Sequence, residues 1–417
     1  MTQLSDDCFA FGGKLLSIED GIRQIGERVE PVAATETIEL LAADGRILAA
    51  DIVAPLDLPP ADNAAVDGYA VRHADLAPNE PTLLPVEGRD VAGEATSIPL
   101  THGTARRIFT GARLPAGADT VFMQEDVEAL GSQVRLPPGL RRGANTRQRG
   151  EDIAAGAVAL VQGRRLRPQD VALAAALGLT RLPVRRRLRV AIFSTGNEIV
   201  SPGLPLGLGR IYDANRFLLA SLVARAGATV TDLGILPDDS AATARALDAA
   251  AACHDLLLTS GGVSTGEEDH VKDAVEAVGR LVFWRLAIKP GRPVAMGVIH
   301  GVPLAGLPGN PVAAFITFAH VVRPLLARLA GESWEKPAAL PVRSAFAYRK
   351  KPGRREYVRV RLSQAADGVV EAHKHAQEGA GILSSLTATH GLVEVPETVT
   401  AISPGETVGF LSYDALI

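Results

Sequence analysis

Cysteine is almost absent from this chain, whose 417 residues include only Cys8 and Cys253. The two are isolated in sequence, and no Cys or His residues are paired at the spacing of a zinc site. The pair His373 and His375 is interpreted as one face of a strand, because alternate residues of a strand point the same way. The sequence therefore predicts no structural zinc.

The chain also lacks an excess of basic charge, and we expect neither an N-terminal signal peptide nor an apolar stretch long enough to cross a bilayer. Its formal net charge is -4 and its basic residues are dispersed, which argues against bulk binding of nucleic acid. The run Arg185 to Arg187 is expected to flank a strand. With isolated cysteines and no membrane segment, the predicted location is the cytoplasm.

What the chain does have is length and apolar residues, 47% hydrophobic against 22% charged, enough for several domains with substantial cores. From residue 183 to about 331, apolar β-rich runs alternate with helical patterns. The runs are LRVAIFSTGNE, ATVTDLGILPDD, DLLLTSGG, LVFWRLAIKPG and VPLAGLPGNP; the helical patterns cover 214–226, 240–252, 270–278 and the residues from Pro311 onward. This alternation predicts a doubly wound α/β domain with a mainly parallel sheet covered on both faces.

One stretch of this domain, residues 255–278, reads as a buried strand, a glycine loop and a helix with Glu267, Glu268 and Asp269 in its first turn. Backbone N–H groups at such a helix start favour phosphate, but three acids there repel it unless a cation lies between. The stretch therefore indicates phosphate bridged by Mg²⁺. The alternative, that the acids only complement the helix dipole, stays open at this point.

Other chemically suggestive residues follow the same predicted strands. Because the carboxyl ends of parallel strands meet at one edge of a sheet, carboxylates, cations and rigid turns are expected to collect there. They are Glu198, Asp238, Asp239, Asp269, Lys289, Arg292 and the turn Pro308 to Pro311. Helix capping and strand ends explain each singly, whereas their convergence favours an oxyanionic or phosphorylated ligand with a divalent cation.

The rest of the chain predicts three further domains. Residues 59–146 form short alternating segments between Gly and Pro, a β-rich domain inserted into a mixed, discontinuous N-terminal domain of residues 14–58 and 147–182. The α/β domain covers 183–331. Residues 332–417 are all-β and predict a small C-terminal β-barrel, in which Arg354 is within possible reach of an anion.

Several separated motifs together resemble one family. They are DNAAVDGYA (62–70), FTGA (109–112), RGED (149–152), STGNE (194–198), YDAN (212–215), SGGVSTGEED (260–269), IKPGRP (288–293) and LPGNP (307–311). In this order they resemble molybdopterin molybdenumtransferase, the MoeA family, which is similar to the C-terminal domain of gephyrin. The resemblance spans nearly the whole chain from about residue 14.

The resemblance implies an elongated four-domain homodimer that inserts molybdate into adenylyl-molybdopterin with release of AMP. In the family the cleft lies between the α/β molybdopterin-binding domain of one subunit and the inserted β-rich domain of the other. Matching catalytic positions are Asp67, Thr110, Asp152, Glu198, Asp238, Asp269 and Lys289, with Glu198, Asp238 and Asp269 as Mg²⁺ ligands. Cofactor-binding positions are Thr195, Gly196, Ser260, Gly261, Gly262, Arg285, Arg292, Pro308, Gly309, Pro311 and Arg354.

The sequence departs from the family pattern at four positions. Asn197 stands where aspartate is usual, which weakens a metal role there. Arg285 and Arg292 replace commoner lysines and keep the charge, but a guanidinium binds anions as a fork. Ala380 lies where serine is expected, which puts an oxyanion contact in doubt.

Lys289, Arg292 and Arg354 are expected to hold molybdate, while Mg²⁺ neutralises the pyrophosphate. A molybdopterin adenylyltransferase is the expected transient partner. Two alternatives stay open at this stage: that the chain is itself such an adenylyltransferase, against which its extra domains argue, or a non-catalytic gephyrin-like scaffold, which would not need the acids at the strand ends.

Overall fold

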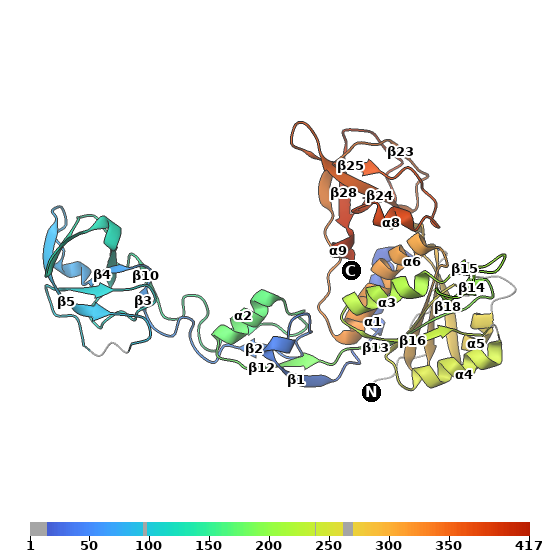
Figure 1. The fold of residues 1–417 in the computed structure, drawn as a ribbon, viewed down its shortest axis with the longest axis horizontal. Helices are drawn as coiled ribbons and strands as arrows, with labels where there is room; N and C mark the ends of the chain where they lie inside the picture. Colours follow the sequence, from blue (N-terminus) through green and yellow to red (C-terminus); the bar gives the residue numbers. More distant parts are fainter. Residues whose placement is uncertain (1–14, 95–97, 238, 262–269) are drawn as a thin grey trace.

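The protein is described from a computed structural model that covers residues 15–94, 98–237, 239–261 and 270–417. Figure 1 shows an elongated chain, with an α/β unit and a β-barrel at one end, a β-rich module at the other, and a slender unit between them. The multidomain α/β plus β fold predicted from the sequence is confirmed.

The α/β unit is built on a six-stranded sheet in the order β16-β13-β17-β21-β20-β18. Its strands are β13 (Arg189–Ser194), β16 (Thr229–Ile235), β17 (Leu256–Ser260), β18 (Gly279–Arg285), β20 (Pro293–Ile299) and β21 (Val302–Leu307). Only β20, among these six, runs antiparallel to its neighbours. The sequence analysis did not predict β20. The predicted run LVFWRLAIKPG, expected to be a strand as far as Ile288, ends as β18 at Arg285.

Helices cover both faces of this sheet, as predicted. One apolar cluster joins a sheet face to α1, α3 and the long helix after Pro311, and a second joins the opposite face to α4 and α5. The helices are α1 (Ile18–Arg28), α3 (Asn215–Arg225), α4 (Ser240–Ala251), α5 (His270–Val278), α6 (Pro311–Thr317) and α7 (Arg323–Ala330), and a short pair, β14 (Ile199–Val200) and β15 (Ile211–Tyr212), projects beside them. Because α1 packs in the first cluster, it lies on the α/β unit, although the prediction grouped residues 14–58 with the N-terminal domain.

The helix after Pro311 corrects one expectation. Residues Pro311–Ala330 form a 20-residue helical run with mean hydropathy 1.5, long and apolar enough to cross a membrane, so the prediction that no such stretch exists is wrong. The run is 94% buried inside the α/β unit, which is typical of a core helix in a soluble protein. Its middle, Phe318–Val322, is π-helical, because Pro324 has no N–H for the carbonyl four residues earlier.

The slender unit pairs distant parts of the chain. Strand β1 (Thr35–Glu39) is antiparallel to β12 (Arg181–Arg185), and β2 (Ile52–Val53) to β11 (Val158–Leu160). The 3₁₀ turn η1 (Leu40–Ala42) and helix α2 (Pro168–Ala176) complete it. The β-rich module is therefore inserted between two segments that fold together.

The β-rich module contains a six-stranded sheet in the order β7-β4-β6-β5-β9-β8 and a separate pair, β3 with β10. Gly68 is required in β4, because a Cβ there would lie 1.7 Å from the Phe122 carbonyl oxygen of β7. The elements are β3 (Asn63–Ala64), β4 (Gly68–Val71), η2 (His73–Asp75), β5 (Thr82–Asp90), β6 (Ala105–Ile108), β7 (Thr120–Met123), η3 (Gln124–Asp126), β8 (Glu128–Leu130), β9 (Gln133–Leu136) and β10 (Thr146–Arg147).

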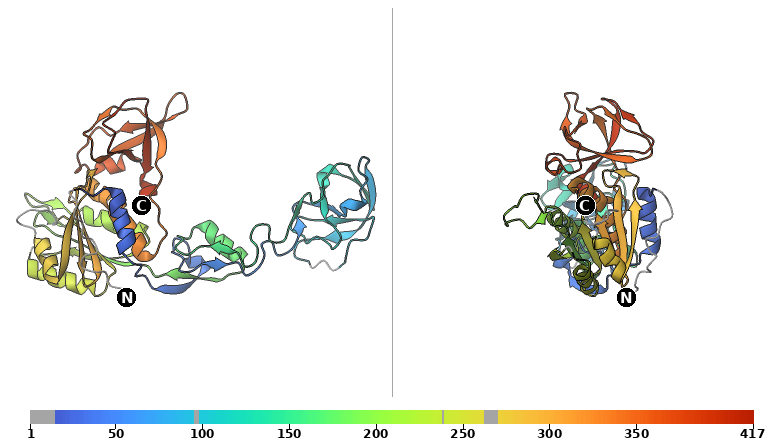
Figure 2. Two further views of the ribbon diagram at one scale, coloured as in Figure 1. Left: turned by 180° about the vertical axis from the view of Figure 1, so that it is seen from behind. Right: turned by 90° about the vertical axis from the view of Figure 1, so that its right-hand side faces the viewer.

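The C-terminal unit is a closed barrel, as predicted. Its strands follow the order β24-β25-β22-β28-β26, and β26, the last, pairs again with β24, the first. Strand β19 (Ile288–Lys289), which belongs to the α/β part of the sequence, joins β24 as an extra strand. The other elements are β22 (Leu340–Ser344), β23 (Tyr348–Arg349), β24 (Arg355–Gln364), β25 (Val370–Lys374), α8 (Ser384–Thr387), β26 (Gly391–Val395), β27 (Ala401–Ile402), β28 (Thr407–Ser412) and α9 (Tyr413–Leu416). Figure 2 shows the barrel seated over the α/β unit.

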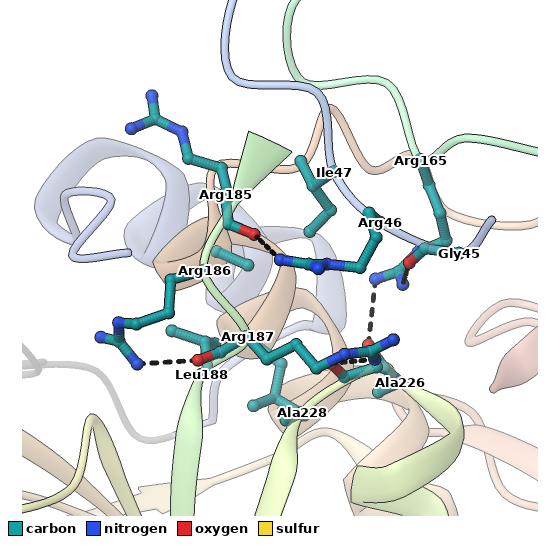
Figure 3. A pocket seen from close by; sticks show the side chains of 13 residues that line it. Gly45, Arg46, Ile47, Arg165, Arg185, Arg186, Arg187, Leu188, Ala226 and Ala228 are labelled. Atoms are coloured by element: carbon teal, nitrogen blue, oxygen red, sulfur yellow. Dashed lines mark hydrogen bonds between the residues drawn. The ribbon is translucent and has the colours of Figure 1, made fainter. Parts of the chain in front are cut away.

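Arginines hold the slender unit to the α/β unit. Figure 3 shows Arg46, Arg165 and Arg187 around a small cavity there, beside the end of α3. Arg165 donates to the Gly45 carbonyl at 2.9 Å and to the Ala226 carbonyl at 3.0 Å. It also shares the Glu332 carboxylate with Arg323. Burial alone raises the pKa of Glu332, but the two arginines bring it below its usual range, so the carboxylate stays charged.

We predict that His320 makes the stability of the α/β unit sensitive to acid. The imidazole is buried and stacks on Tyr357, with ring centroids 4.7 Å apart. Burial, with the charge of Lys336, lowers its pKa to about 3, whereas an unfolded histidine titrates near 6.5. Its contribution is therefore complete above about pH 6.5 and is lost as pH falls towards 3, by roughly 1.4 kcal/mol per pH unit.

Replacing the ring nitrogens tests this. Between pH 7 and pH 5 the wild type should lose about 2 kcal/mol more unfolding free energy than His320→Phe, measured by urea unfolding followed by the fluorescence of Trp284 and Trp334. His102→Gln, at a side chain that is 76% exposed, is the control. Parallel pH profiles for wild type and His320→Phe would contradict the assignment.

Candidate active site

The carboxyl ends of β13, β17 and β21 lie side by side in the sheet and carry most of the predicted α/β site residues. Ser260, at the end of β17, donates its hydroxyl to the Pro308 carbonyl at 3.1 Å. The Gly261 N–H donates to the Leu307 carbonyl at 3.0 Å. The structure thus brings Ser260 and Gly261 together with Pro308 and Gly309, as the parallel sheet requires.

Asn215, the first residue of α3, joins these ends and was not among the predicted site residues. Its side-chain amide donates to the Ser260 hydroxyl at 2.8 Å and to the Gly309 carbonyl at 2.7 Å. One amide therefore fixes the loops after β17 and β21 relative to α3. The motif YDAN contained the signal, since an amide at a helix start beside predicted strand ends is placed to bridge loops. Asp213 of the same motif instead pairs with Arg216 at 2.8 Å and is buried.

The turn after β13 presents Glu198 close to the main chain. Gly196 has φ +126, and a Cβ there would lie 2.5 Å from a carboxylate oxygen of Glu198, so glycine permits this carboxylate to fold over the turn. Thr195 is 4% exposed, whereas Glu198 is exposed. Thr195, Gly196 and Glu198 thus stand at the same edge as Ser260.

Three buried hydroxyls near this edge have no hydrogen-bond partner in the part of the chain that the structure describes. They belong to Ser194, Thr195 and Thr259, at the ends of β13 and β17. Since a buried polar group without a partner costs free energy, groups of this kind commonly contact a water molecule or a ligand. The donor-rich edge fits an oxygen-bearing ligand.

The predicted cations Arg285, Lys289 and Arg292 lie on the connection from β18 to β20, here called the cation loop. Arg285 ends β18, Lys289 is in the short strand β19, and Arg292 precedes β20. All three are exposed, and β18 runs parallel to β17, so the loop emerges at the same edge as Ser260. The loop is held at both sides: Ala287 donates its N–H to the Leu16 carbonyl and accepts from the Arg355 N–H, each at 2.8 Å.

The barrel closes over the turn LPGNP. Pro311 is at the first position of α6, and the N–H of Val312 donates to the Ala380 carbonyl at 3.0 Å. Ala380, the departure noted above, therefore meets this turn through its main chain, which any residue type allows. Buried Arg359 fixes the same loop by donating to the Gln377 and Gly379 carbonyls at 3.1 and 2.9 Å. Arg354 lies in the turn before β24.

The proposed metal ligands divide between described and undescribed residues. Asp238, Asp269 and Gly262 lie outside the described residues, and Glu198 lies within them. In residues 15–94, 98–237, 239–261 and 270–417, no three His, Cys, Asp or Glu side chains are grouped closely enough to hold a metal. Asp239 caps α4 by accepting from the Ala242 N–H at 2.6 Å. Glu198 is exposed and carries a carboxylate, the kind of ligand that Mg²⁺ prefers.

The remaining predicted residues lie on the β-rich module and its connection. Asp67 accepts hydrogen bonds from the main-chain N–H and the hydroxyl of Thr110, both at 2.7 Å. These bonds, with the charge of Arg107, lower the pKa of Asp67, so it is an anion at neutral pH. Asp152 is separate from this pair: it follows β10, and its N–H donates to the Leu58 carbonyl.

The structure does not bring all predicted residues into one place within a subunit. Figures 1 and 2 show β4, which Asp67 precedes, at the opposite end of the chain from β13 and α6. The candidate site of this chain is therefore the sheet edge with Thr195, Ser260, Asn215, the cation loop and the barrel. The Asp67–Thr110 pair is a second, distant cluster.

The fold and the candidate site define a class of multidomain α/β protein. Its C-terminal barrel contacts the sheet edge that carries the candidate site, and its slender unit carries an inserted β-rich module. Its three regions match the MoeA N-terminal region (domain I and II) over residues 16–178, a probable molybdopterin binding domain over 191–328 and the MoeA C-terminal region (domain IV) over 341–413. The chain belongs to the MoeA family of molybdopterin molybdenumtransferases.

Relatives match over nearly their whole length. The chain is 36% identical to the molybdopterin molybdenumtransferase of Haemophilus influenzae, with 97% of this chain and 100% of that protein covered. It is 38% identical to molybdopterin molybdenumtransferase 2 of Mycobacterium tuberculosis, covering 88% and 93%. The crystal structure of the molybdopterin biosynthesis protein moeA from Pyrococcus horikoshii OT3 superimposes with a TM-score of 0.80 at 31% identity, covering 96% and 100%.

We predict that Asn215→Ala loosens the loops after β17 and β21. Loss of the amide removes one hydrogen bond to the buried Ser260 hydroxyl and one to the exposed Gly309 carbonyl, each worth about 0.5–1.5 kcal/mol. Hydrogen–deuterium exchange should therefore speed up in peptides covering 256–261 and 305–312, while barrel peptides stay unchanged.

Ser221→Ala, on the same helix, is the comparison variant, because the Ser221 hydroxyl donates within α3, to the Phe217 carbonyl at 2.8 Å. Equal exchange in Asn215→Ala and the wild type would show that Asn215 does not hold this edge.

Proposed function

We propose that this chain catalyses the insertion of molybdate into adenylyl-molybdopterin with release of AMP, giving Mo-molybdopterin. The observation that carries the proposal is the collection of hydroxyls, an amide and three cations at one sheet edge, in a chain that matches named transferases over nearly their full length. The alternatives, an adenylyltransferase or a gephyrin-like scaffold, are not favoured by that match.

The residues divide the work by charge. Molybdate is a tetrahedral dianion and the adenylylated pterin carries a pyrophosphate, so their approach is opposed by repulsion. Lys289, Arg292 and Arg354 hold the molybdate, and Thr195, Gly196, Ser260, Gly261, Gly262, Arg285, Pro308, Gly309 and Pro311 hold the pterin and its pyrophosphate. Glu198, Asp238 and Asp269 would hold Mg²⁺, which would offset the pyrophosphate charge.

The second proposal concerns assembly: the working form is a homodimer in which Asp67, Thr110 and Asp152 of one subunit complete the site of the other. Two observations support it. Within a subunit, β4 and β10 lie at the opposite end of the chain from β13 and β14, the strands on either side of Glu198. In addition, the segment from β14 to the start of α3 exposes several large apolar side chains, Leu204, Leu206, Leu208, Ile211, Tyr212 and Phe217, and exposed apolar side chains that gather in one patch are typical of interfaces.

The protein acts in the cytoplasm, on adenylyl-molybdopterin delivered by a transient molybdopterin adenylyltransferase partner. Helix Pro311–Ala330 is buried and leaves no membrane anchor within the described residues.

The central test is AMP release from adenylyl-molybdopterin by purified protein, which should require both molybdate and Mg²⁺. Lys289→Gln should raise the molybdate concentration for half-maximal turnover about tenfold, with a smaller change in pterin affinity, because only the dianion loses its direct partner.

Lys351→Gln, at an exposed barrel lysine, is the matched control and should leave both quantities near wild type. AMP release without molybdate, or coincident molybdate titrations for Lys289→Gln and the wild type, would count against the assignment.

The dimer is tested by mixing two inactive variants, Asp67→Asn and Glu198→Gln. Mixed dimers contain one intact site, built from Glu198 of one subunit and Asp67 of the other. Random exchange of subunits should therefore restore about a quarter of wild-type activity.

Sedimentation of each variant should show a dimer, and each alone should stay inactive. Absence of recovery after demonstrated subunit exchange would place both residues in the same subunit's site or outside it.

A further inference from the structure

Lys289 leaves the α/β unit on a strand that the barrel holds. Strand β19 pairs in parallel with β24, and the register sets Lys289 opposite Glu356. The Lys289 ammonium lies 3.2 Å from a carboxylate oxygen of Glu356. A buried carboxylate of the barrel, that of Glu356, therefore contacts Lys289, one of the cations of the proposed site.

The two side chains differ sharply in exposure. Glu356 is 3% exposed and Lys289 is 51% exposed. Tyr348 donates its hydroxyl at 2.6 Å to the same carboxylate oxygen that contacts Lys289. Burial raises the pKa of Tyr348 well above its usual range, and Glu356 adds to this, so the phenol stays protonated and keeps donating.

A small cavity of about 40 Å³ opens beside this pair, lined by Lys289, Tyr348, Tyr357, Arg359 and Lys374 among others. Lys374 pairs with Glu378 and lies over the Tyr348 ring, 5.7 Å from its centroid. Arg359 contacts carbonyls and the Ser385 hydroxyl. Basic side chains and the Glu378 carboxylate thus line the cavity where Lys289 emerges, and the Glu356 carboxylate contacts the Lys289 ammonium.

The Lys289–Glu356 ion pair is not needed to join the barrel to the α/β unit. The barrel is already joined to the α/β unit by the hydrogen bond from the Arg355 N–H to the Ala287 carbonyl and by the ion pair of Arg355 with Glu19 of α1. An ion pair to a half-exposed lysine adds little stability. Ordering a free lysine, by contrast, costs up to about 2 kcal/mol of side-chain entropy, which an anion would otherwise have to offset.

We propose that Glu356, oriented by Tyr348, is a positioning residue that holds the Lys289 ammonium in place for molybdate. This inference rests on the proposed function. The carboxylate fixes one side of the ammonium and leaves its other N–H groups for the oxyanion.

The test compares Glu356→Gln with Glu356→Asp. Glu356→Gln removes the charge, and Glu356→Asp keeps it but withdraws it by one methylene. Positioning requires that both raise half-saturating molybdate about threefold to tenfold, with kcat and pterin affinity changed much less. If the carboxylate acts only through its charge, Glu356→Gln lowers the value and Glu356→Asp leaves it unchanged, which overturns the proposal, as do unchanged values in both.

Tyr348→Phe keeps the carboxylate and removes its orienting hydroxyl, so a smaller rise is expected; it replaces the Glu356 variants if these fail to fold. Glu371→Gln, which removes another barrel carboxylate, one paired with Arg343 at 2.8 Å, is the control and should not change the titration.

A second readout does not depend on turnover. Acylation of Lys289, measured by mass spectrometry relative to exposed Lys351, should be severalfold faster in both Glu356 variants, because the amine is released from its partner. Equal acylation rates overturn the proposal. If acylation is faster in the Glu356 variants but the wild type releases no AMP, the proposed function is contradicted and the Lys289–Glu356 contact is still established.

Discussion

The short segment from Leu286 to Lys289 is the point on which the arrangement of this end of the molecule depends. Its main chain pairs with Leu16 on one side and with Arg355 at the start of β24 on the other. Three parts of the chain, at Leu16, at Leu286 to Lys289 and at Arg355, are thereby ordered around one loop. Main-chain hydrogen bonds fix this placement and are insensitive to side-chain identity, so the cations on the loop can vary between arginine and lysine without moving it.

Charge pairing reinforces the same junction from outside the site. Arg355 contacts Glu19 of α1 at 2.6 Å and Glu394 of β26 at 3.1 Å, and Lys336 of the connecting segment contacts both carboxylates. The pKa values of Glu19 and Glu394 are lowered, burial opposing and the basic partners prevailing. A network of several partly buried charges stabilises more than isolated surface pairs do, which suits a junction between separately folded units.

Much of the α/β unit was predictable, because strands alternating with helices leave few topologies and carboxyl ends of parallel strands must share an edge. Helix α4 begins at Ser240 after its cap Asp239, and α3 is followed by Gly227 with φ +87, which agrees with the predicted helical ranges 240–252 and 214–226. Strand β20 was missed because it follows a proline–glycine loop and lies beside another apolar run. The departure of β19 into the barrel could not be foreseen, since strand pairing between distant segments has no local sequence signal.

The sequence predicted which types of residue lie at the candidate site but not which side chains contact one another there. Lys289 and Ser260 stand out in sequence as residues after strands, whereas Asn215 and Glu356 acquire meaning only through contacts across 45 and 67 positions. Buried polar partners of this kind are invisible to periodicity, because an isolated Glu in β24 reads as one more alternating polar residue. The physical reason is general: a sheet edge determines which loops meet, but hydrogen bonds between side chains on those loops determine how rigidly they meet. For the proposed function, in which the site brings two anions together, that rigidity would let the cations act at fixed positions without first being ordered by the ligand.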